Sequence, residues 1–260
     1  MAFGKSLSRL LSPSKGPRLK PSDAAVRKTN IQRYYAHANG GDAYLSLYDR
    51  AAEITGSQNK FVTQNRFFTL YQMVNRLLDR GVEGDVAECG CWHGLSAFIT
   101  AETLAARGWT GKVWVFDSFE GGLSSKVAED RRGRAAKRDN ASEKAEKDKF
   151  ISSYDAVKKN FERFPFVSIH KGWIPQVFDA AQGLAERRFA LVHVDVDLYE
   201  PTRDSLAFFG PRMSPGGVIV FDDYGSANFP GATQAIDEFR AATPHSFFLE
   251  THLMGAVLAL

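Results

Sequence analysis

Residues 85–96 read Asp-Val-Ala-Glu-Cys-Gly-Cys-Trp-His-Gly-Leu-Ser, and this stretch decides the fold. Its beginning predicts a short strand that runs into Gly90, and a helix is expected from about Leu95 to Arg107, closed by Gly108. Glycines let a backbone approach a ligand closely, and a loop that leads into a helix N-terminus is a common ligand site. The spacing is E-x-G-x-x-x-G, without the third glycine of the pyrophosphate-binding G-x-G-x-x-G loop.

On either side of this stretch, strand-like and helix-like segments alternate along the chain. Further strands are expected at 112–116, 166–170, 189–194 and 218–221, with two extended pieces around Gly255 between 246 and 260. Helices are expected at 42–56, 64–80, 150–163, 175–187, 202–210 and 231–241. Strands separated by helices predict βαβ units, and therefore an α/β fold with a mainly parallel sheet.

The composition indicates a globular protein with a basic N-terminal tail. Of the 260 residues, 44% are hydrophobic and 24% charged, and no apolar run approaches the roughly 20 residues of a membrane span. Residues 1–33 hold eight Lys or Arg against one acid, so we expect a flexible basic tail and a mildly acidic body, although the formal charge is +3. This distribution argues against nucleic acid as the main partner. The two cysteines, Cys89 and Cys91, fit a reducing cytoplasm.

Two acidic residues indicate a nucleoside cofactor. Glu88 stands at the first loop, where a carboxylate would favour the cationic sulfonium of S-adenosylmethionine. Asp117 follows the second strand, where an acid accepts hydrogen bonds from a ribose diol; the alternative role is a helix N-cap. The two motifs by themselves leave S-adenosylmethionine and a dinucleotide both open.

Four carboxylates follow the fourth and fifth strands, Asp195 and Asp197 after the fourth and Asp222 and Asp223 after the fifth. Paired strands lie about 4.8 Å apart, so Asp195 and Asp222 should converge if these strands are neighbours. Such crowding is costly unless a cation lies between the carboxylates, and oxygen ligands select a hard ion, Mg²⁺ before Mn²⁺ or Ca²⁺. An extended backbone would place Asp195 and Asp197 on one face. The alternative is that these aspartates are turn residues and helix caps.

Two segments are expected to border the main domain, residues 85–260. Residues 34–84 predict a helical cap that could cover the active site or pair subunits. The stretch 126–149 holds nine Lys or Arg and six Asp or Glu. It follows a strand end, where ligand loops lie, so we expect a lid-like insertion, with a solvated helix as the simpler alternative.

Five motifs together resemble the macrocin O-methyltransferase (TylF) family. They are ECGCWHG, VFDSFEG, HVDVDLYEPT, SPGGVIVFDDYG and GATQAIDEFR, and the resemblance runs from about Phe61 to Arg240. It implies a Rossmann-like class I methyltransferase fold, with a mainly parallel seven-stranded sheet, helices on both faces and an antiparallel C-terminal hairpin. It further implies S-adenosylmethionine and Mg²⁺ as cofactors and a homo-oligomer.

The resemblance also assigns roles to individual residues. It makes Asp197 the general base and Asp195, Asp222 and Asp223 the metal ligands. The positions that it assigns to cofactor binding are Glu88, Gly90, Gly94, Ser96, Asp117, Ser118, Gly172, Trp173 and Asp195. The chain departs from the family at Val196, where glycine is common, and after Gly122, where a proline usually follows soon. Acceptor identity is therefore the least transferable inference.

The expected function is methyl transfer to a hydroxyl of a sugar or glycoside with a vicinal diol, in natural-product or polysaccharide tailoring. A phenolic or catechol-like diol is the alternative acceptor. An NAD-dependent oxidoreductase is less favoured, because the G-x-G-x-x-G loop is missing. A metal-dependent hydrolase and a catalytically inert binding protein are the remaining alternatives.

Overall fold

The computed structural model describes residues 41–137 and 139–260. The predicted tail at 1–33 lies outside the described residues. The chain divides into two compact units, 1–46 and 47–260, and the whole sheet belongs to the second. The helical cap at 34–84 and the lid-like character of 126–149 stay predictions.

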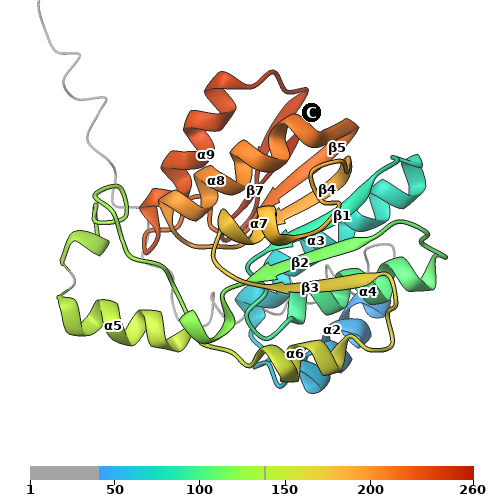
Figure 1. Ribbon diagram of the computed structural model, residues 1–260, viewed down its shortest axis with the longest axis horizontal. Coiled ribbons are helices and arrows are strands. Elements are labelled where there is room, and N and C mark those ends of the chain that lie inside the picture. The colour runs from blue at the N-terminus through green and yellow to red at the C-terminus, as the bar shows by residue number, and fades with distance from the viewer. Residues whose placement is uncertain (1–40, 138) are drawn as a thin grey trace, which may run out of the picture. The chain divides into compact units, whose positions relative to one another are not determined.

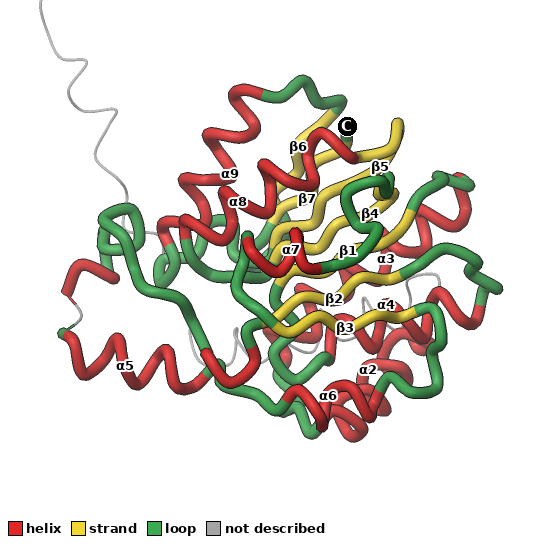
Figure 2. Tube along the Cα trace, in the orientation of Figure 1, coloured by secondary structure: helices red, strands yellow, loops and turns green. Residues whose placement is uncertain are grey.

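Seven strands in the described residues form one sheet in the order β3-β2-β1-β4-β5-β7-β6 (Figures 1 and 2). Strands β1 to β5 are parallel, whereas β7 is antiparallel to β5 and β6 is antiparallel to β7. This confirms the predicted α/β sheet with its C-terminal hairpin. The strands are β1 (Asp85–Cys89), β2 (Val113–Asp117), β3 (Val167–Lys171), β4 (Phe189–Val194), β5 (Met213–Phe221), β6 (Phe247–Glu250) and β7 (Ala256–Ala259).

Helices cover both faces of the sheet. In Figure 1, α7, α8 and α9 lie on the face toward the viewer, and α3 and α4 lie behind. The helices are α2 (Gly41–Thr55), α3 (Phe61–Arg80), α4 (Leu95–Ala106), α5 (Asn140–Lys149), α6 (Tyr154–Asn160), α7 (Gln176–Ala180), α8 (Tyr199–Phe209) and α9 (Pro230–Ala242). Short 3₁₀ turns, η1 to η3, occupy Phe119–Gly121, Ala135–Lys137 and Gly210–Arg212.

The local sequence explains why these elements form. All six residues of β4 are buried, as expected for a parallel strand that is covered on both faces. Helix α3 buries Phe67, Leu70, Val74 and Leu77, which recur at the spacing of one helical face. It ends at Gly81, whose φ of 59° is the left-handed conformation that glycine adopts most readily.

The structure corrects the start of the fifth strand. The sequence predicts Val218–Phe221, but β5 begins at Met213. The ladder passes from Phe189–Met213 directly to Leu191–Val218, so the predicted turn at 214–217 is an irregularity inside the strand. Two predicted helices are also shorter, since 150–163 reduces to α6 and 175–187 to α7.

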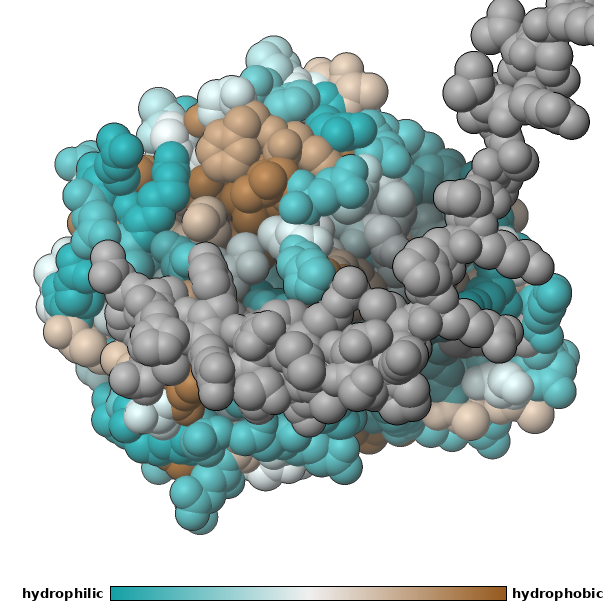
Figure 3. Space-filling view, turned by 180° about the vertical axis from the view of Figure 1, so that it is seen from behind, coloured by the Kyte–Doolittle hydropathy of each residue, from teal (hydrophilic) through white to brown (hydrophobic). Residues whose placement is uncertain are grey.

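The surface seen from behind is largely hydrophilic and carries an apolar patch (Figure 3). Exposed apolar side chains include Phe247 and Leu249 of β6, the edge strand of the sheet. None of the helices in the described residues combines the length and the apolarity that a membrane crossing requires.

Candidate active site

A cavity of about 360 Å³ lies at the carboxyl ends of the parallel strands. In an open α/β sheet, ligands bind in the crevice outside these strand ends. The predicted site residues on its wall are Gly90, Ser96, Asp117, Ser118, Gly172, Trp173, Asp195, Asp197, Asp222 and Asp223. Two predicted cofactor residues, Glu88 and Gly94, do not line the cavity, and both lie in the shell behind it.

The loop after β1 is shaped by close backbone packing. Gly90 has a φ of 83°, and a Cβ at this position would overlap the main-chain carbonyl of Asp195. The loops after β1 and β4 can therefore touch only because residue 90 is glycine. Gly94 has a φ of 86° and precedes α4, where a Cβ would lie 3.0 Å from the ring of Phe161.

Asp117 binds this loop through its carboxylate. Oδ2 accepts hydrogen bonds from the N–H groups of Cys91 at 2.9 Å and Trp92 at 2.8 Å, and Oδ1 accepts one from Phe119 at 2.6 Å. Burial raises the pKa of Asp117, and these three N–H groups oppose the rise. Two carboxylate oxygens offer about four acceptor positions, so a ribose diol would share this group with the protein's own backbone. Asp117 thus orders the cofactor loop as well as facing the cavity.

Glu88 lies behind the cavity wall in a buried polar chain. Its Oε1 accepts a hydrogen bond from the Ser96 hydroxyl at 2.6 Å, and its Oε2 lies 3.5 Å from Nδ1 of His193. The pairing of β1 with β4 places Glu88 directly opposite His193. Burial lowers the pKa of His193, but the neighbouring Glu88 raises it further, so the net shift is upward. His193 is buried, and its contact with Glu88 joins strands β1 and β4 behind the site.

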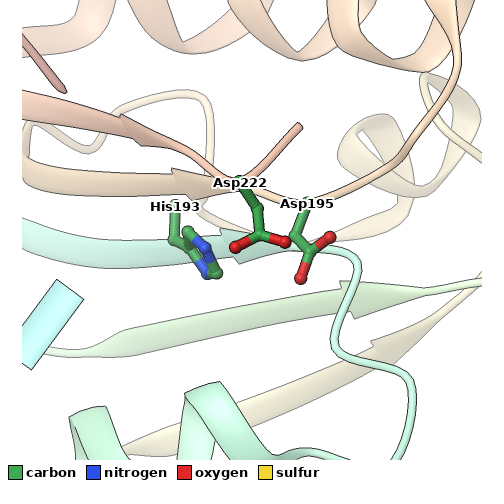
Figure 4. Close-up of side chains that lie close together, drawn as sticks. All are labelled: His193, Asp195 and Asp222. Atoms are coloured by element: carbon green, nitrogen blue, oxygen red, sulfur yellow. The ribbon is translucent and has the colours of Figure 1, made fainter. Parts of the chain in front are cut away.

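The four predicted carboxylates meet as two overlapping groups. His193, Asp195 and Asp222 form one group and Asp195, Asp197 and Asp223 the other, with the ligand atoms of each group within 4.8 Å of one another. Figure 4 shows the carboxylate of Asp222 between the imidazole of His193 and the carboxylate of Asp195. The pairing of Val194 with Phe221 confirms that β4 and β5 bring Asp195 and Asp222 together.

Asp222 and Asp223 fall into different groups for a geometric reason. They are consecutive residues in the bend that follows β5, and their side chains meet different partners. Asp222 faces His193 and helix α3, whereas Asp223 faces Asp197. Asp195 belongs to both groups and joins them.

Burial and mutual repulsion raise the pKa values of three carboxylates in this cluster. Burial, followed by the charges of Asp222 and Asp223, raises the pKa of Asp195 well above its ordinary value. Burial, followed by Asp223, raises the pKa of Asp197 in the same way. Burial and Asp222 raise the pKa of Asp223 to about 7. Such shifts are typical of sites where carboxylates await a counter-charge.

The expected extended arrangement of Asp195 and Asp197 is wrong. β4 ends at Val194, and Asp197 has a φ of 61°, in the left-handed region that Asp tolerates better than most residues. Its N–H donates a hydrogen bond to Oδ2 of Asp223 at 2.9 Å, which holds the turn. Asp197 therefore reaches the cluster through a strained turn that Asp223 stabilises, rather than through strand periodicity.

The charged stretch 126–149 is attached to the site by buried groups. Asp130 Oδ1 accepts a hydrogen bond from the N–H of Tyr199 at 2.8 Å and so caps the N-terminus of α8. Lys126 and Glu146 form an ion pair whose side chains are largely buried. Next to this stretch, Phe150 lines the cavity and its ring lies 5.8 Å from that of Trp92.

Sequence reasoning missed Arg66, which belongs to the carboxylate cluster. Its Nη2 lies 2.6 Å from Oδ2 of Asp222, and it lines the cavity. A signal was present, because Arg66 precedes Leu70 by four residues and so lies on the buried stripe of α3. A charged residue on a buried stripe indicates a buried partner of opposite charge.

The sheet order, the terminal hairpin and the position of the cavity define a class I methyltransferase fold. The solved O-methyltransferase NovP matches with a TM-score of 0.63 and 26% identity, covering 75% of this chain and 79% of that one. The calicheamicin methyltransferase CalS11 matches over 100% of this chain and 98% of its own, with a TM-score of 0.61 and 17% identity, and supports the fold alone.

Residues 35–246 match the family described as Macrocin-O-methyltransferase (TylF), and the chain belongs to this family of S-adenosylmethionine-dependent O-methyltransferases. The resemblance seen in the sequence motifs is thereby confirmed.

Three similar proteins are O-methyltransferases that are named for their substrates. A tetracenomycin 4'-O-methyltransferase from Streptomyces olivaceus, whose substrate carries a dimethoxy-rhamnosyl group, is 36% identical over 61% of this chain and 60% of its own length. The mycinamicin III 3''-O-methyltransferase of Micromonospora griseorubida is 31% identical over 69% of each chain. The demethyldecarbamoylnovobiocin O-methyltransferase of Streptomyces niveus is 31% identical over 68% of this chain and 65% of its own. The match thus spans between 60% and 69% of these relatives.

Proposed function

We propose that the protein is an S-adenosylmethionine- and Mg²⁺-dependent O-methyltransferase that methylates one hydroxyl of a sugar or glycoside with a vicinal diol. One observation carries the proposal: a cofactor loop that depends on glycine and a cluster of four carboxylates, three of them buried, line the same cavity. A protein that binds only the cofactor does not need the carboxylate cluster, and a protein that binds only a metal does not need the glycine-containing loop.

The residues on one side of the cavity fit S-adenosylmethionine. Gly90 brings the loop after β1 against the loop after β4 without a Cβ in the way. Asp117 faces the cavity at the end of β2, where a ribose diol is held in related folds. Gly172 and Trp173 follow β3, and the half-exposed ring of Trp173 offers an apolar surface for an adenine.

The residues on the other side fit a hard divalent cation. The donors are buried carboxylate oxygens, and Asp222 Oδ2 is buried without accepting a hydrogen bond, although Arg66 contacts it as an ion pair. Oxygen donors of this kind select Mg²⁺. The predicted ligands Asp195, Asp222 and Asp223 would hold the ion, with Asp195 common to both groups and Asp222 and Asp223 approaching it from different groups.

The chemistry then divides among the protein's own groups. When bound, S-adenosylmethionine supplies the methyl group, and Mg²⁺ lowers the pKa of the acceptor hydroxyl. Asp197 accepts the proton of that hydroxyl, and Asp223 holds the Asp197 turn in place through the N–H contact at 2.9 Å. The shared cavity wall at Gly90 and Asp195 fixes the acceptor against the cofactor, which favours in-line attack.

The names of the relatives support a sugar acceptor. One name gives a substrate that carries a dimethoxy-rhamnosyl group and methylation at a 4'-oxygen, and another gives methylation at a 3''-oxygen. A phenolic or catechol-like diol presents the same pair of oxygens and is the alternative acceptor. A homo-oligomer, a cytoplasmic location and the absence of a nucleic-acid partner stay predictions.

A methyl-transfer assay tests the proposal. Purified protein is incubated with methyl-labelled S-adenosylmethionine and either a 6-deoxyhexose glycoside with a vicinal diol or a catechol. We expect label in the glycoside, loss of transfer with EDTA and recovery with excess Mg²⁺. Transfer that is indifferent to EDTA would remove the metal from the proposal, and transfer to catechol alone would replace the acceptor. Binding of NAD in place of S-adenosylhomocysteine in a calorimetric titration would replace the reaction class.

A further inference from the structure

Arg66 is a largely covered cation that contacts the carboxylate cluster from helix α3, outside the strand-end loops. It lies on α3, and its Nη2 is 2.6 Å from Oδ2 of Asp222, with the two side chains 19% and 4% exposed. The neighbouring residues Phe67 and Leu70 of the same helix are buried apolar side chains. The guanidinium therefore enters the site through an otherwise apolar helix face.

The contact between Arg66 and Asp222 is important because of the charge balance of the cluster. Four carboxylates lie together, three of them buried and that of Asp195 half-buried, and among the ion pairs of the described residues only that of Arg66 with Asp222 reaches them. The buried His193 beside Asp222 is itself next to Glu88.

A divalent cation would need the same carboxylate that Arg66 contacts. A guanidinium satisfies carboxylate oxygens by donating hydrogen bonds, whereas Mg²⁺ or Mn²⁺ binds the lone pairs of those oxygens directly. Two positive groups on one carboxylate also repel each other, and this repulsion is strong at buried sites.

We propose that the Arg66 guanidinium and the catalytic cation compete for Asp222, so that Arg66 neutralises the cluster when no ion is bound and sets how tightly the ion binds. This inference rests on the proposed function, because it assumes that the cluster binds a divalent cation. It makes α3 part of the metal site, with Arg66 as a positioning residue that acts through Asp222 rather than on the substrate.

The test is the affinity of the full-length protein for Mn²⁺, measured by electron paramagnetic resonance in the presence of S-adenosylhomocysteine. Arg66→Gln removes the competing charge, and we expect it to lower the Kd for Mn²⁺ by about tenfold or more. The matched control is Arg107→Gln, which removes an equal charge from the exposed ion pair between Arg107 and Asp79. We expect the control to bind Mn²⁺ as the wild type does.

Thermal unfolding provides a second readout, independent of activity. In EDTA, Arg66→Gln should melt below the wild type, because it leaves the four carboxylates without a counter-charge. In Mn²⁺ its melting temperature should rise more than that of the wild type. If the Gln variant does not fold, Arg66→Met keeps the apolar stem, and the same two results are expected.

The outcomes separate this inference from the proposed function. Equal or weaker Mn²⁺ binding by folded Arg66 variants, with normal binding by the wild type, would overturn the competition and leave the metal site standing. Mn²⁺ binding by Arg66→Gln but not by the wild type would support the competition most strongly. Binding by neither protein, with S-adenosylhomocysteine still bound, would overturn both the competition and the metal requirement.

Discussion

The two sides of the cavity are built on different physical principles. On the side of β1 and β2, the carboxylate of Asp117 is satisfied within the protein by three backbone N–H groups. On the side of β4 and β5, four carboxylates crowd together against the guanidinium of Arg66. The first side is organised before a ligand arrives, whereas the second carries an electrostatic cost that a cation would relieve.

Residues that stabilise the fold and residues that carry the chemistry therefore lie on different sides of one cavity. Substitutions on the cofactor side should act mainly through the fold, because its loops are held by backbone packing. Substitutions on the acidic side should act mainly through catalysis and cation binding, and several of them should make the metal-free protein more stable, because they remove repulsion.

The largest effect is expected at the proposed base. Asp197→Asn should lower kcat by roughly 10²–10⁴, because an amide cannot accept the proton of the acceptor hydroxyl. Steady-state kinetics measure this loss, and calorimetry should show that S-adenosylhomocysteine binds as before. Asp204→Asn, which changes a carboxylate paired with Arg203 on α8, is the control and should be neutral. Normal turnover in Asp197→Asn would remove this residue from the mechanism.

The next largest effect is expected at Gly90, where the backbone of the cofactor side is closely packed. Gly90→Ala should destabilise the protein by about 3 kcal/mol or more, because the new Cβ overlaps the carbonyl of Asp195 and the φ of 83° is unfavourable. Gly108→Ala shares the positive φ, at 69°, but meets no atom within 4 Å, so it should cost only about 1–2 kcal/mol. Urea denaturation compares the two variants. Equal losses would show that the close approach of the two loops is not essential.

The acidic side should give the metal-free protein an unusual pH dependence. The folded pKa of Asp223 is raised to about 7, so this group favours folding below its unfolded pKa and loses that contribution as pH rises toward 7. In EDTA the wild type should therefore lose stability relative to Asp223→Asn between about pH 4 and pH 7, by an amount on the order of 2–4 kcal/mol. Excess Mn²⁺ should remove the difference.

Denaturation of both proteins across this pH range measures the effect. A wild type that gains stability relative to Asp223→Asn as pH rises would contradict the crowding of carboxylates in the folded state.

The smallest effect concerns the link between the charged stretch and the catalytic turn. Asp130→Ala removes the acceptor for the N–H groups of Tyr199 and Val127, and it should cost about 1–2 kcal/mol, in the range of a lost helix cap. Arg131→Gln breaks the ion pair with Glu143 and an exposed hydrogen bond from Arg131 to the carbonyl of Lys126, and it should cost less than about 1 kcal/mol. Urea denaturation measures the free energy of unfolding of both variants. An unchanged value for Asp130→Ala would show that the hydrogen bonds of Asp130 do not stabilise the fold.

The sequence predicted the sheet because periodicity and turn residues are local signals. Strands β1 and β4 were placed at their observed bounds, and the convergence of Asp195 with Asp222 followed from pairing of neighbouring strand ends. The start of β5 was missed, because the turn signals at 214–217 lie within an irregular part of the strand.

The contacts that the sequence did not predict depend on distant segments. The pairing of Arg66 with Asp222 joins residues far apart in the chain, and no local pattern states which buried acid an arginine will meet. The left-handed turn at Asp197 was also missed, because it depends on the hydrogen bond from its N–H to Asp223. The cap that Asp130 provides for α8 is a third contact of this kind.

The most direct test is a crystal structure with S-adenosylhomocysteine and Mn²⁺, with the ion located by its anomalous scattering. We expect the cofactor against Gly90, Asp117 and Trp173 and one Mn²⁺ peak on Asp195, Asp222 and Asp223. A cofactor bound in that place with no Mn²⁺ peak on the carboxylates, at millimolar metal, would contradict a metal-dependent reaction and leave the aspartates as bases of a metal-free transfer.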